Sequence, residues 1–211
     1  MEIVGPLKLI IAMKGHPGTG KSTLAHSLAA SLRCPLIDKD DVRDCTAVIQ
    51  ESHVSPSTIA KLLNDLSYDV IWRIAGTQLA LGLSVVIDSP LSRRSHLDRL
   101  LELEALYGAH VIIIECRPHD ENEWRRRLER RGAGPSAASS WHKPATWQDL
   151  QKLLDGYAGC SDYDVGDVPK LTVDTTAPVE VGELVSAVLQ FIMSHSRCRH
   201  QDPIHTQLDR C

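Results

Sequence analysis

The sequence has few aromatic residues and no long apolar run. Phe, Trp and Tyr make up 4% of its 211 residues, with a single Phe. A buried core must therefore be built from Leu, Val, Ile and Ala. The longest apolar runs, such as residues 9–13 and 111–114, fall far short of the roughly 20 residues that a membrane span requires. We expect no membrane-spanning helix and no membrane partner.

The sequence also lacks a cysteine framework and an excess of positive charge. Its six cysteines are scattered without any C-x-x-C pair, which favours free thiols in a reducing compartment. The apolar stretch between Lys8 and Lys14 is too short for a signal peptide, so we expect a cytoplasmic location. The net charge of −4 is opposite in sign to that of most proteins that bind nucleic-acid backbones. It argues against a nucleic-acid partner.

What the sequence does have is an alternation of two kinds of hydrophobic segment. Short runs rich in branched residues predict buried strands at 7–13, 35–37, 84–87, 110–115 and 170–173. Segments of helical period lie between and after them, at 21–32, 58–81, 96–107, 122–131, 147–157 and 179–194. Strands separated by helices pair in parallel through right-handed crossovers. The pattern predicts a three-layer α/β sandwich with a five-stranded parallel sheet, in one domain over 1–194.

Two segments stand outside this alternation. Residues 132–146 are rich in small residues and prolines. They are either a plain surface loop or, as we favour from their place after the fourth strand's helix, a mobile lid over a ligand site. Trp141 lies within this segment and Trp147 directly after it. These two side chains can either cover a bound ring or, as we favour, anchor the segment. Residues 195–211 have no apolar period and a Cys/His spacing that fits no zinc site, so they are predicted to form a flexible tail.

The strongest motif follows the first predicted strand. It reads G-x-x-x-x-G-K-S and consists of Gly15, His16, Pro17, Gly18, Thr19, Gly20, Lys21 and Ser22, with Thr23 beside it. The glycines let backbone N–H groups point at phosphate oxygens, and the helix N-terminus adds partial positive charge. Lys21 can reach the β- and γ-phosphates and the Ser22 hydroxyl can ligate Mg²⁺. The strand–loop–helix context predicts a nucleoside triphosphate site rather than a chance match.

A cluster of carboxylates follows the second predicted strand. Asp38, Asp40 and Asp41 precede Arg43 at a position where parallel strands end beside a ligand crevice. A carboxylate there can accept the proton of an attacking hydroxyl, and the arginine can hold the acceptor. The alternative is that Asp40 or Asp41 caps the short helix that follows. We favour catalysis by at least one of these aspartates.

The third predicted strand ends in Asp88. This residue is a candidate for orienting Mg²⁺ through water or for contacting the acceptor, and a simple strand-end turn is an equal alternative. Arg93 and Arg94 follow closely, and Arg93 is a candidate acceptor contact. Either arginine is as often only solvated.

The densest run of basic residues spans 125–131. Arg127 and Arg131 lie four apart on one helical face and can neutralise charge on a transferring phosphoryl group. The other arginines alternate with glutamates, which is typical of a solvated, ion-paired surface.

These motifs occur in the order and spacing of one family. The sequence resembles the small P-loop kinases grouped with gluconate and shikimate kinases, chloramphenicol phosphotransferase, zeta toxins and the kinase domain of polynucleotide kinase. The resemblance covers residues 7–194. It implies that Asp40 is the catalytic base, that Arg43 binds the acceptor, and that Arg127 and Arg131 reach the triphosphate from the lid. It also implies that Thr175, within Asp174–Thr176, lies near the adenine.

The expected function is therefore transfer of the γ-phosphoryl group of ATP, with Mg²⁺, to a hydroxyl of a small molecule. Lys21, Asp40, Arg127 and Arg131 are the expected catalytic residues. The identity of the acceptor stays open, because this scaffold serves many substrates. A polynucleotide 5′-hydroxyl kinase and a nucleotide switch that hydrolyses ATP without an acceptor are the alternatives. The sequence carries no signal for an oligomeric state.

Overall fold

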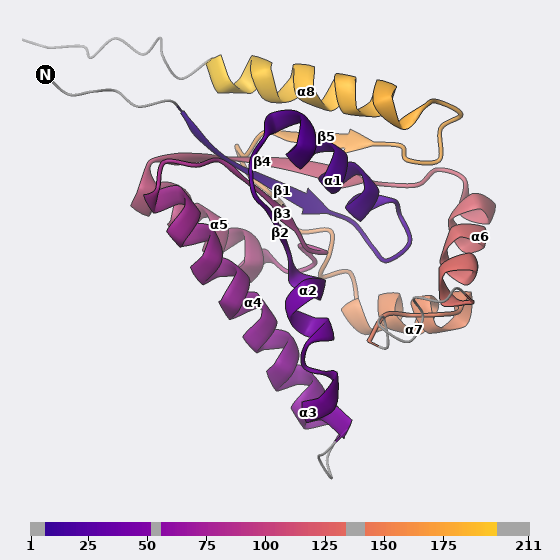
Figure 1. The fold of residues 1–211 in the computed structure, drawn as a ribbon. Helices are drawn as coiled ribbons and strands as arrows, with labels where there is room; N and C mark the ends of the chain where they lie inside the picture. Colours follow the sequence, from indigo (N-terminus) through magenta and orange to yellow (C-terminus); the bar gives the residue numbers. More distant parts are fainter. Residues whose placement is uncertain (1–6, 52–55, 134–141, 198–211) are drawn as a thin grey trace, which may run out of the picture.

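The structure is a computed structural model that describes residues 7–51, 56–133 and 142–197. Its centre is a parallel sheet of five strands in the order β2-β3-β1-β4-β5 (Figure 1). The strands are β1 (Lys8–Lys14), β2 (Leu36–Asp38), β3 (Val85–Asp88), β4 (Ala109–Cys116) and β5 (Lys170–Val173). The helices are α1 (Lys21–Leu32), α2 (Lys39–Asp44), α3 (Ala47–Glu51), α4 (Pro56–Ala80), α5 (Arg94–Tyr107), α6 (Glu121–Gly132), α7 (Trp147–Tyr157) and α8 (Val181–Arg197).

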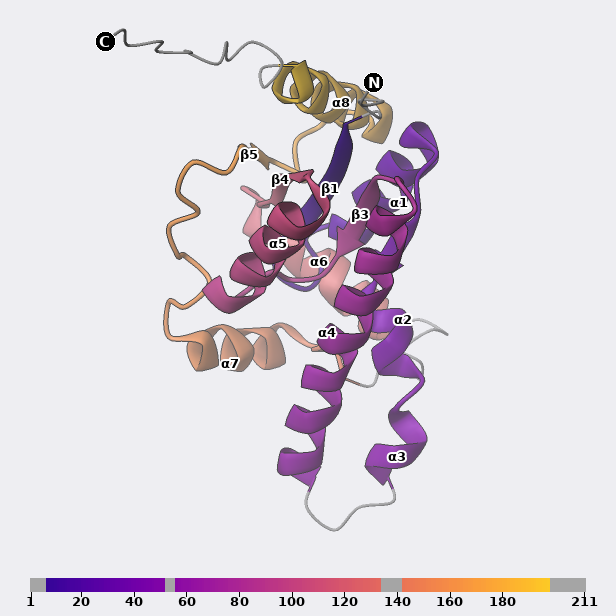
Figure 2. The same cartoon turned by 90° about the vertical axis from the view of Figure 1, so that its left-hand side faces the viewer.

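Successive side chains of each central strand enter opposite layers. On β1, Ile10 and Ala12 pack against α4 and α5, whereas Ile11 and Met13 pack against α1 and α8. The same alternation holds on β4, where all eight residues are buried. Figure 2 shows the two helical layers on either side of the sheet. Burial on both faces explains why these strands read as continuous apolar runs in the sequence.

The expected fold is confirmed. All five predicted strands form within two residues of their predicted ends, and all six predicted helices are present. The sequence did not predict α3. The last helix, α8, continues to Arg197, so it includes the first three residues of the predicted tail.

The predicted lid, residues 132–146, lies mostly outside the described residues, as does Trp141. The lid therefore stays a prediction. The four cysteines within the described ranges are free thiols. In those same ranges, no helix has both the length and the apolar character that crossing a bilayer needs.

Parallel pairing brings the carboxyl ends of all strands to one edge of the sheet. At that edge β1 leads into the glycine-rich loop, β2 ends at Asp38 and β3 ends at Asp88. Helices α6 and α7 lie beyond the same edge (Figure 1). Ligand sites of open parallel sheets form at this edge.

Candidate functional site

The loop between β1 and α1 has the backbone that phosphate binding requires. Gly15, Gly18 and Gly20 have positive φ angles of 146°, 81° and 83°, which side chains disfavour. A Cβ at Gly15 would lie 2.7 Å from the carbonyl oxygen of Cys116, and one at Gly18 would lie 3.1 Å from the Leu128 side chain. Within the part of the chain that the structure describes, no side chain caps the N-terminus of α1, so its first N–H groups are left for an anion.

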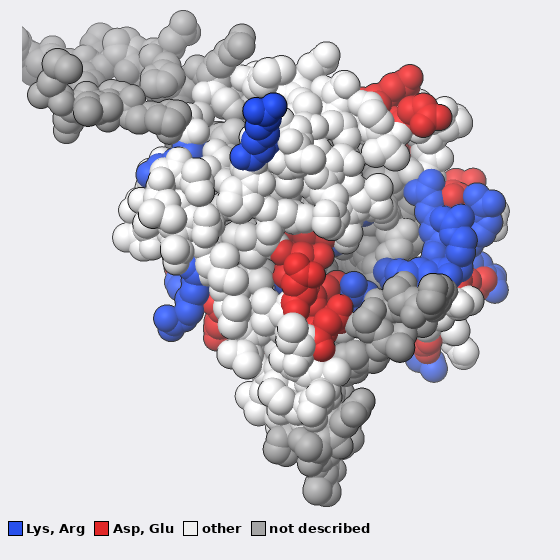
Figure 3. All heavy atoms as spheres, viewed as in Figure 1, with Lys and Arg blue, Asp and Glu red and all other residues white. Residues whose placement is uncertain are grey.

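A cavity of about 720 Å³ adjoins this loop. Its size lies in the upper part of the roughly 300–1,000 Å³ range of small-molecule sites. On the face seen in Figure 3, Lys and Arg gather over α6, and Asp and Glu gather over α2, on either side of a hollow. Seven basic and two acidic residues line the cavity, namely Lys21, Lys39, Arg93, Arg127, Arg130, Arg131 and Lys143 against Asp40 and Glu123. The cavity is therefore suited to anionic ligands.

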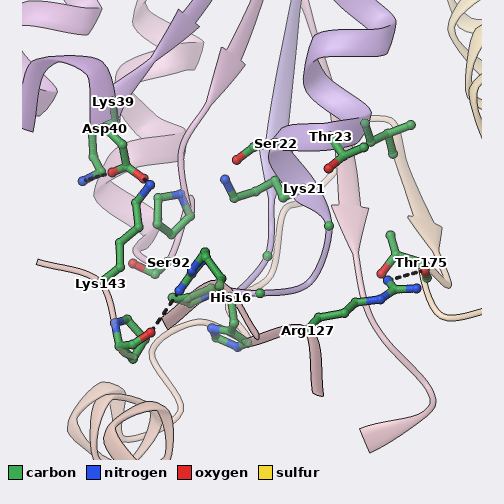
Figure 4. Close-up of a pocket in the computed structure, with 18 of the residues that line it drawn as sticks. His16, Lys21, Ser22, Thr23, Lys39, Asp40, Ser92, Arg127, Lys143 and Thr175 are labelled. Carbon is green, nitrogen blue, oxygen red and sulfur yellow. Dashed lines mark hydrogen bonds and ion pairs between the residues drawn. The ribbon is translucent and has the colours of Figure 1, made fainter. Parts of the chain in front are cut away.

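The cavity lies at the carboxyl ends of the strands. Its two ends lie beside the two outermost strands, β5 and β2. Figure 4 shows Thr23, Arg127 and Thr175 on one side of Lys21 and Ser22, and Lys39, Asp40, Ser92 and Lys143 on the other. We call the first the nucleotide end; it is lined by Thr23, Leu24, Arg127, Thr175, Ala177, Val179, Val181 and Leu184. We call the second the acceptor end; it is lined by Lys39, Asp40, Asn64, Tyr68, Ser92, Arg93, His96, Lys143 and Tyr157.

Lys21 forms an ion pair with Asp88, whose side chain is fully buried. The second oxygen of that carboxylate, Oδ2, is buried and has no hydrogen-bond partner among the described residues. Asp38 lies beside Asp88 in the β2–β3 register, and burial together with the Asp88 charge raises the pKa of Asp38 to about 6. Crowded carboxylates with an unpaired oxygen fit a hard cation such as Mg²⁺, which prefers oxygen ligands. These carboxylates therefore fit the ion that accompanies a nucleoside triphosphate.

Asp40 is held by three cationic or potentially cationic groups. Its carboxylate contacts the ammonium groups of Lys39 and Lys143, each at 2.8 Å, and His142 Nε2 at 3.2 Å. Burial opposes ionisation, but these neighbours outweigh it and hold the pKa of Asp40 far below its usual range. Asp40 is therefore an ionised hydrogen-bond acceptor at neutral pH.

The capping role considered for Asp40 and Asp41 belongs to another residue. Asp38 is the N-cap of α2, and its Oδ1 accepts a hydrogen bond from the Asp40 backbone N–H at 2.8 Å. Removing the Asp40 carboxylate therefore leaves the helix cap in place.

The two arginines of α6 point to different partners. Arg127 donates from Nη1 to the Thr175 carbonyl at 2.7 Å and from Nε to Glu123 at 2.6 Å. Arg131 donates from Nη2 to the Pro144 carbonyl at 3.0 Å. Both line the cavity, Arg127 beside the nucleotide end and Arg131 near enough to Asp40 to feel its charge. The structure thus brings both predicted lid arginines to the site.

The turn after β3 contains a strained residue. Leu91 has a left-handed φ of 46° although it is fully buried, a conformation that L-residues adopt only when the surroundings demand it. Tyr163 donates to the Leu91 carbonyl at 2.8 Å, and Gly15 N–H donates to the Pro90 carbonyl at 3.2 Å. This anchored turn ties the glycine-rich loop to the segment that carries Ser92 and Arg93.

Aromatic rings brace the loop from the other side. The His16 ring stacks with Trp124 of α6 and Tyr157 of α7, with centroid distances of 6.3 and 5.9 Å. Trp124 Nε1 also donates to the Pro17 carbonyl at 2.9 Å, and its ring meets that of Trp147 edge-on. Burial and the nearby Lys14 charge lower the pKa of His16. The helices that flank the predicted lid are thereby attached to the phosphate loop.

Most of the residues singled out in the sequence line this cavity, but Thr19, Asp38, Asp41, Arg43 and Asp88 do not. Arg43 is buried, hydrogen-bonds the Thr46 hydroxyl within α2 and its following turn, and is not on the cavity wall, so this geometry does not support an acceptor contact. Asp88 is also off the wall and reaches the site through Lys21.

Sequence reasoning missed several wall residues. Lys39 stood next to two recognised aspartates, and that position was a usable signal. Asn64, Tyr68 and His96 lie inside helices, where a polar residue on the cavity side looks like any surface or core residue. Lys143 reaches the cavity from within the segment predicted as the lid, and Tyr157 reaches it from the helix that follows.

The chain matches one family model and several solved structures. Residues 10–155 match the family model described as an AAA domain. The chain is similar to a structure described as a candidate kinase from Chloroflexus aurantiacus, with 26% identity, a TM-score of 0.67, and coverage of 87% of this chain and 98% of that one.

Two further solved structures share the fold. A gluconokinase from Sinorhizobium meliloti has 20% identity and a TM-score of 0.56, with coverage of 92% and 96% of the two chains. A shikimate kinase from Acinetobacter baumannii, in complex with shikimate, has 16% identity and a TM-score of 0.56, with coverage of 90% and 94%. No curated protein sequence matches the chain.

Proposed function

This chain belongs to the AAA domain family and has the fold of the small P-loop kinases, and from that premise we propose that it transfers the γ-phosphoryl group of ATP to a hydroxyl of a small molecule. One observation carries the proposal: a single cavity joins the phosphate loop to Asp40. A site that only binds or hydrolyses nucleotide needs no such second compartment.

The nucleotide end accounts for the binding of ATP. The backbone of Gly15–Gly20 and the start of α1 would hold the phosphates, with Lys21 on the β- and γ-phosphates. Ser22 and Asp88 would hold Mg²⁺, which supplies charge neutralisation when it is bound with the nucleotide. For Lys21 to reach phosphate it must exchange its contact with Asp88, and this exchange releases that carboxylate for the cation.

The acceptor end accounts for the transfer. Asp40 would accept a hydrogen bond from the attacking hydroxyl and orient it toward the γ-phosphorus. Arg127 and Arg131 would bring positive charge to the transferring group, which is where catalysis of phosphoryl transfer is concentrated. Of the predicted acceptor contacts we retain Arg93, which lines the cavity, in preference to Arg43.

The test is a screen of hydroxylated metabolites for ADP production, followed by the variant Asp40→Asn. We expect at least one compound to stimulate ADP production, and Asp40→Asn to lower that transfer by about 10² or more. Nucleotide affinity should stay near that of the unaltered protein, and Asp38 still caps α2. The melting temperature should fall, because the buried Lys39 ammonium loses its carboxylate partner.

Two results would contradict the proposal. ADP production that no acceptor stimulates would point to a nucleotide switch. Full transfer activity in Asp40→Asn would remove the carboxylate from the mechanism.

A further inference from the structure

Two rings that the nucleotide does not need form part of the acceptor end. Tyr68 of α4 and His96 of α5 stack with their centroids 3.9 Å apart and their planes at 26°, and both line the cavity. Trp72 packs against both rings from one turn further along α4. Because these three rings fix one another, the polar edges of Tyr68 and His96 are held in place before any ligand arrives.

Neither ring is charged at neutral pH. Burial lowers the pKa of His96 to about 4, with help from the nearby Arg93 and Lys39 charges, and burial raises the pKa of the Tyr68 hydroxyl. The Nδ1 atom of His96 is buried and has no hydrogen-bond partner among the described residues. Because a buried atom is out of reach of a ligand, Nε2 is the ring nitrogen that a ligand can contact. Asn64 lies one turn before Tyr68 on the same face of α4 and lines the same wall. These side chains form a neutral hydrogen-bonding surface.

A single cation beside this surface lacks a counter-charge. Lys39 and Lys143 share Asp40, and Lys21 is paired with Asp88. The Arg93 side chain is exposed and makes no ion pair or hydrogen bond within the described residues. Arg127, Arg130 and Arg131 belong to α6, which lies on the opposite side of the molecule from α4 and α5 in Figure 1. Arg93 is therefore a cation available to a second anion rather than to the triphosphate.

We infer, on the basis of the proposed kinase function, that the acceptor is a small hydroxylated molecule that also carries an acidic group. Arg93 binds the acidic group, and Asn64, Tyr68 and His96 hydrogen-bond the uncharged part. These four residues determine which hydroxyl lies against Asp40. An acceptor without the acidic group lacks the contact with Arg93 and therefore binds more weakly.

The transfer balances without any further reactant. The acceptor O–H bond breaks and its oxygen forms a bond to the γ-phosphorus, while the bond from that phosphorus to the β–γ bridging oxygen breaks. The hydroxyl proton moves along its hydrogen bond to Asp40 and is then released to solvent, and ADP leaves with the electron pair of the broken bond. The products are ADP and the phosphorylated acid.

The first experiment uses matched compounds with the full-length protein, ATP and Mg²⁺. Each hydroxylated carboxylic acid is assayed beside its methyl ester and amide, each sugar phosphate beside the free sugar, and neutral polyols form a third group. We expect ADP production with members of one acidic class only, and the comparison of carboxylates with phosphates identifies which acid Arg93 accepts. Transfer to neutral compounds as fast as to their acidic counterparts would overturn the inference and leave the kinase assignment intact.

The second experiment assigns the contact to Arg93 with a neighbouring residue as control. Arg93→Met should raise the KM for the acidic acceptor by about 10- to 100-fold, the usual value of a hydrogen bond to a charged group. The KM for ATP should not change. Arg94→Met is the matched control, because Arg94 is exposed, pairs with Asp98 and is not on the cavity wall. Equal effects of the two variants would overturn the assignment of Arg93.

The third experiment tests the neutral surface. His96→Phe keeps a ring for stacking on Tyr68 but removes both ring nitrogens, so it should raise the KM for the acceptor several-fold and reduce the preference for it over deoxy analogues. Calorimetric titration of the acid into protein with a non-hydrolysable ATP analogue gives the same comparison without turnover. If the acid binds Arg93→Met and His96→Phe as tightly as the unaltered protein, these residues do not form the acceptor site. If no hydroxylated compound of any group is phosphorylated or bound, the proposed function fails along with this inference.

Discussion

The two ends of the cavity are built in different ways. The phosphate-binding part of the nucleotide end comes from one continuous stretch, 15–23, and relies on backbone N–H groups and glycine conformations. The acceptor end is assembled from α2, α4, the turn after β3, α5 and residues beyond α6. One end uses groups that every peptide possesses, and the other uses particular side chains. A shared phosphate chemistry can therefore be kept while the acceptor changes.

The largest expected effect on the nucleotide end comes from the removal of the Lys21 side chain. Lys21→Met should lower phosphoryl transfer by about 10³ or more, since it removes the charge that meets the β- and γ-phosphates. It should also cost about 3–5 kcal/mol of unfolding free energy, because Asp88 is left buried and unpaired.

The double variant Lys21→Met/Asp88→Asn separates the two effects. Removing both charges should restore most of the stability in a thermal melt but none of the transfer. A single variant as stable as the unaltered protein would mean that the Lys21–Asp88 ion pair does not form in solution.

Substitutions of Arg127 and Arg131 distinguish the two ends further, because these arginines lie toward different parts of the cavity. Arg131→Ala should lower kcat by about 10³, the effect expected for an arginine that stabilises the transferring phosphoryl group. Arg127→Ala should act mainly on the KM for ATP, by about tenfold, because Arg127 is tied to Thr175 at the nucleotide end. Steady-state kinetics with varied ATP distinguishes the two. Full activity in both variants would make this helix a solvated surface and remove the argument for the lid.

The stacking of His16 with Trp124 and Tyr157 predicts a smaller effect. His16→Phe keeps a ring between Trp124 and Tyr157 and should retain nucleotide affinity within about twofold, because ring pairs contribute only about 0.5–1.5 kcal/mol. His16→Ala removes the stack and should weaken ATP binding several-fold. Fluorescence titration with nucleotide measures both. Equal affinities would show that the loop is held by its backbone alone.

The last expected effect is on stability at acid pH, and it concerns the acceptor end. His96 has a folded pKa of about 4 against an ordinary value of about 6.5. The unfolded chain therefore takes up a proton at His96 that the folded protein excludes, and the stability from this residue is lost as pH falls from about 6.5 to about 4.

His96→Phe should accordingly show a shallower loss of unfolding free energy between pH 7 and 4.5 in urea titrations. Asp38, whose raised pKa acts in the opposite direction, is present in both proteins and cancels in the difference. Parallel pH profiles would mean that His96 titrates normally.

Much of the fold could be predicted because each element carries its own signal. The strands are buried on both faces and so appear as short apolar runs, and α1 and α7 were predicted at their observed ends. The boundaries that moved, such as the end of α8 at Arg197, lie where a polar turn of helix costs little and gives no apolar signal.

The residues of the candidate site likewise divide into those that local sequence predicts and those that only packing determines. Local sequence was enough for Gly15–Ser22, because a glycine pattern between a strand and a helix specifies its own backbone. It was not enough for Arg43, whose hydrogen bond to Thr46 follows from the packing of α2. Nor did it show that Asp38 caps α2 and that Asp40 is surrounded by Lys39, His142 and Lys143.

The sequence by itself determined the layers, the parallel sheet and the phosphate loop, since periodicity and turn chemistry act over a few neighbouring residues. Only the tertiary structure decided the acceptor end, where Tyr68 meets His96 and where no described residue supplies a counter-charge to Arg93. These contacts join residues far apart in the chain, and their energies depend on burial and on neighbouring charges. Both of those arise only when the helices pack on the sheet.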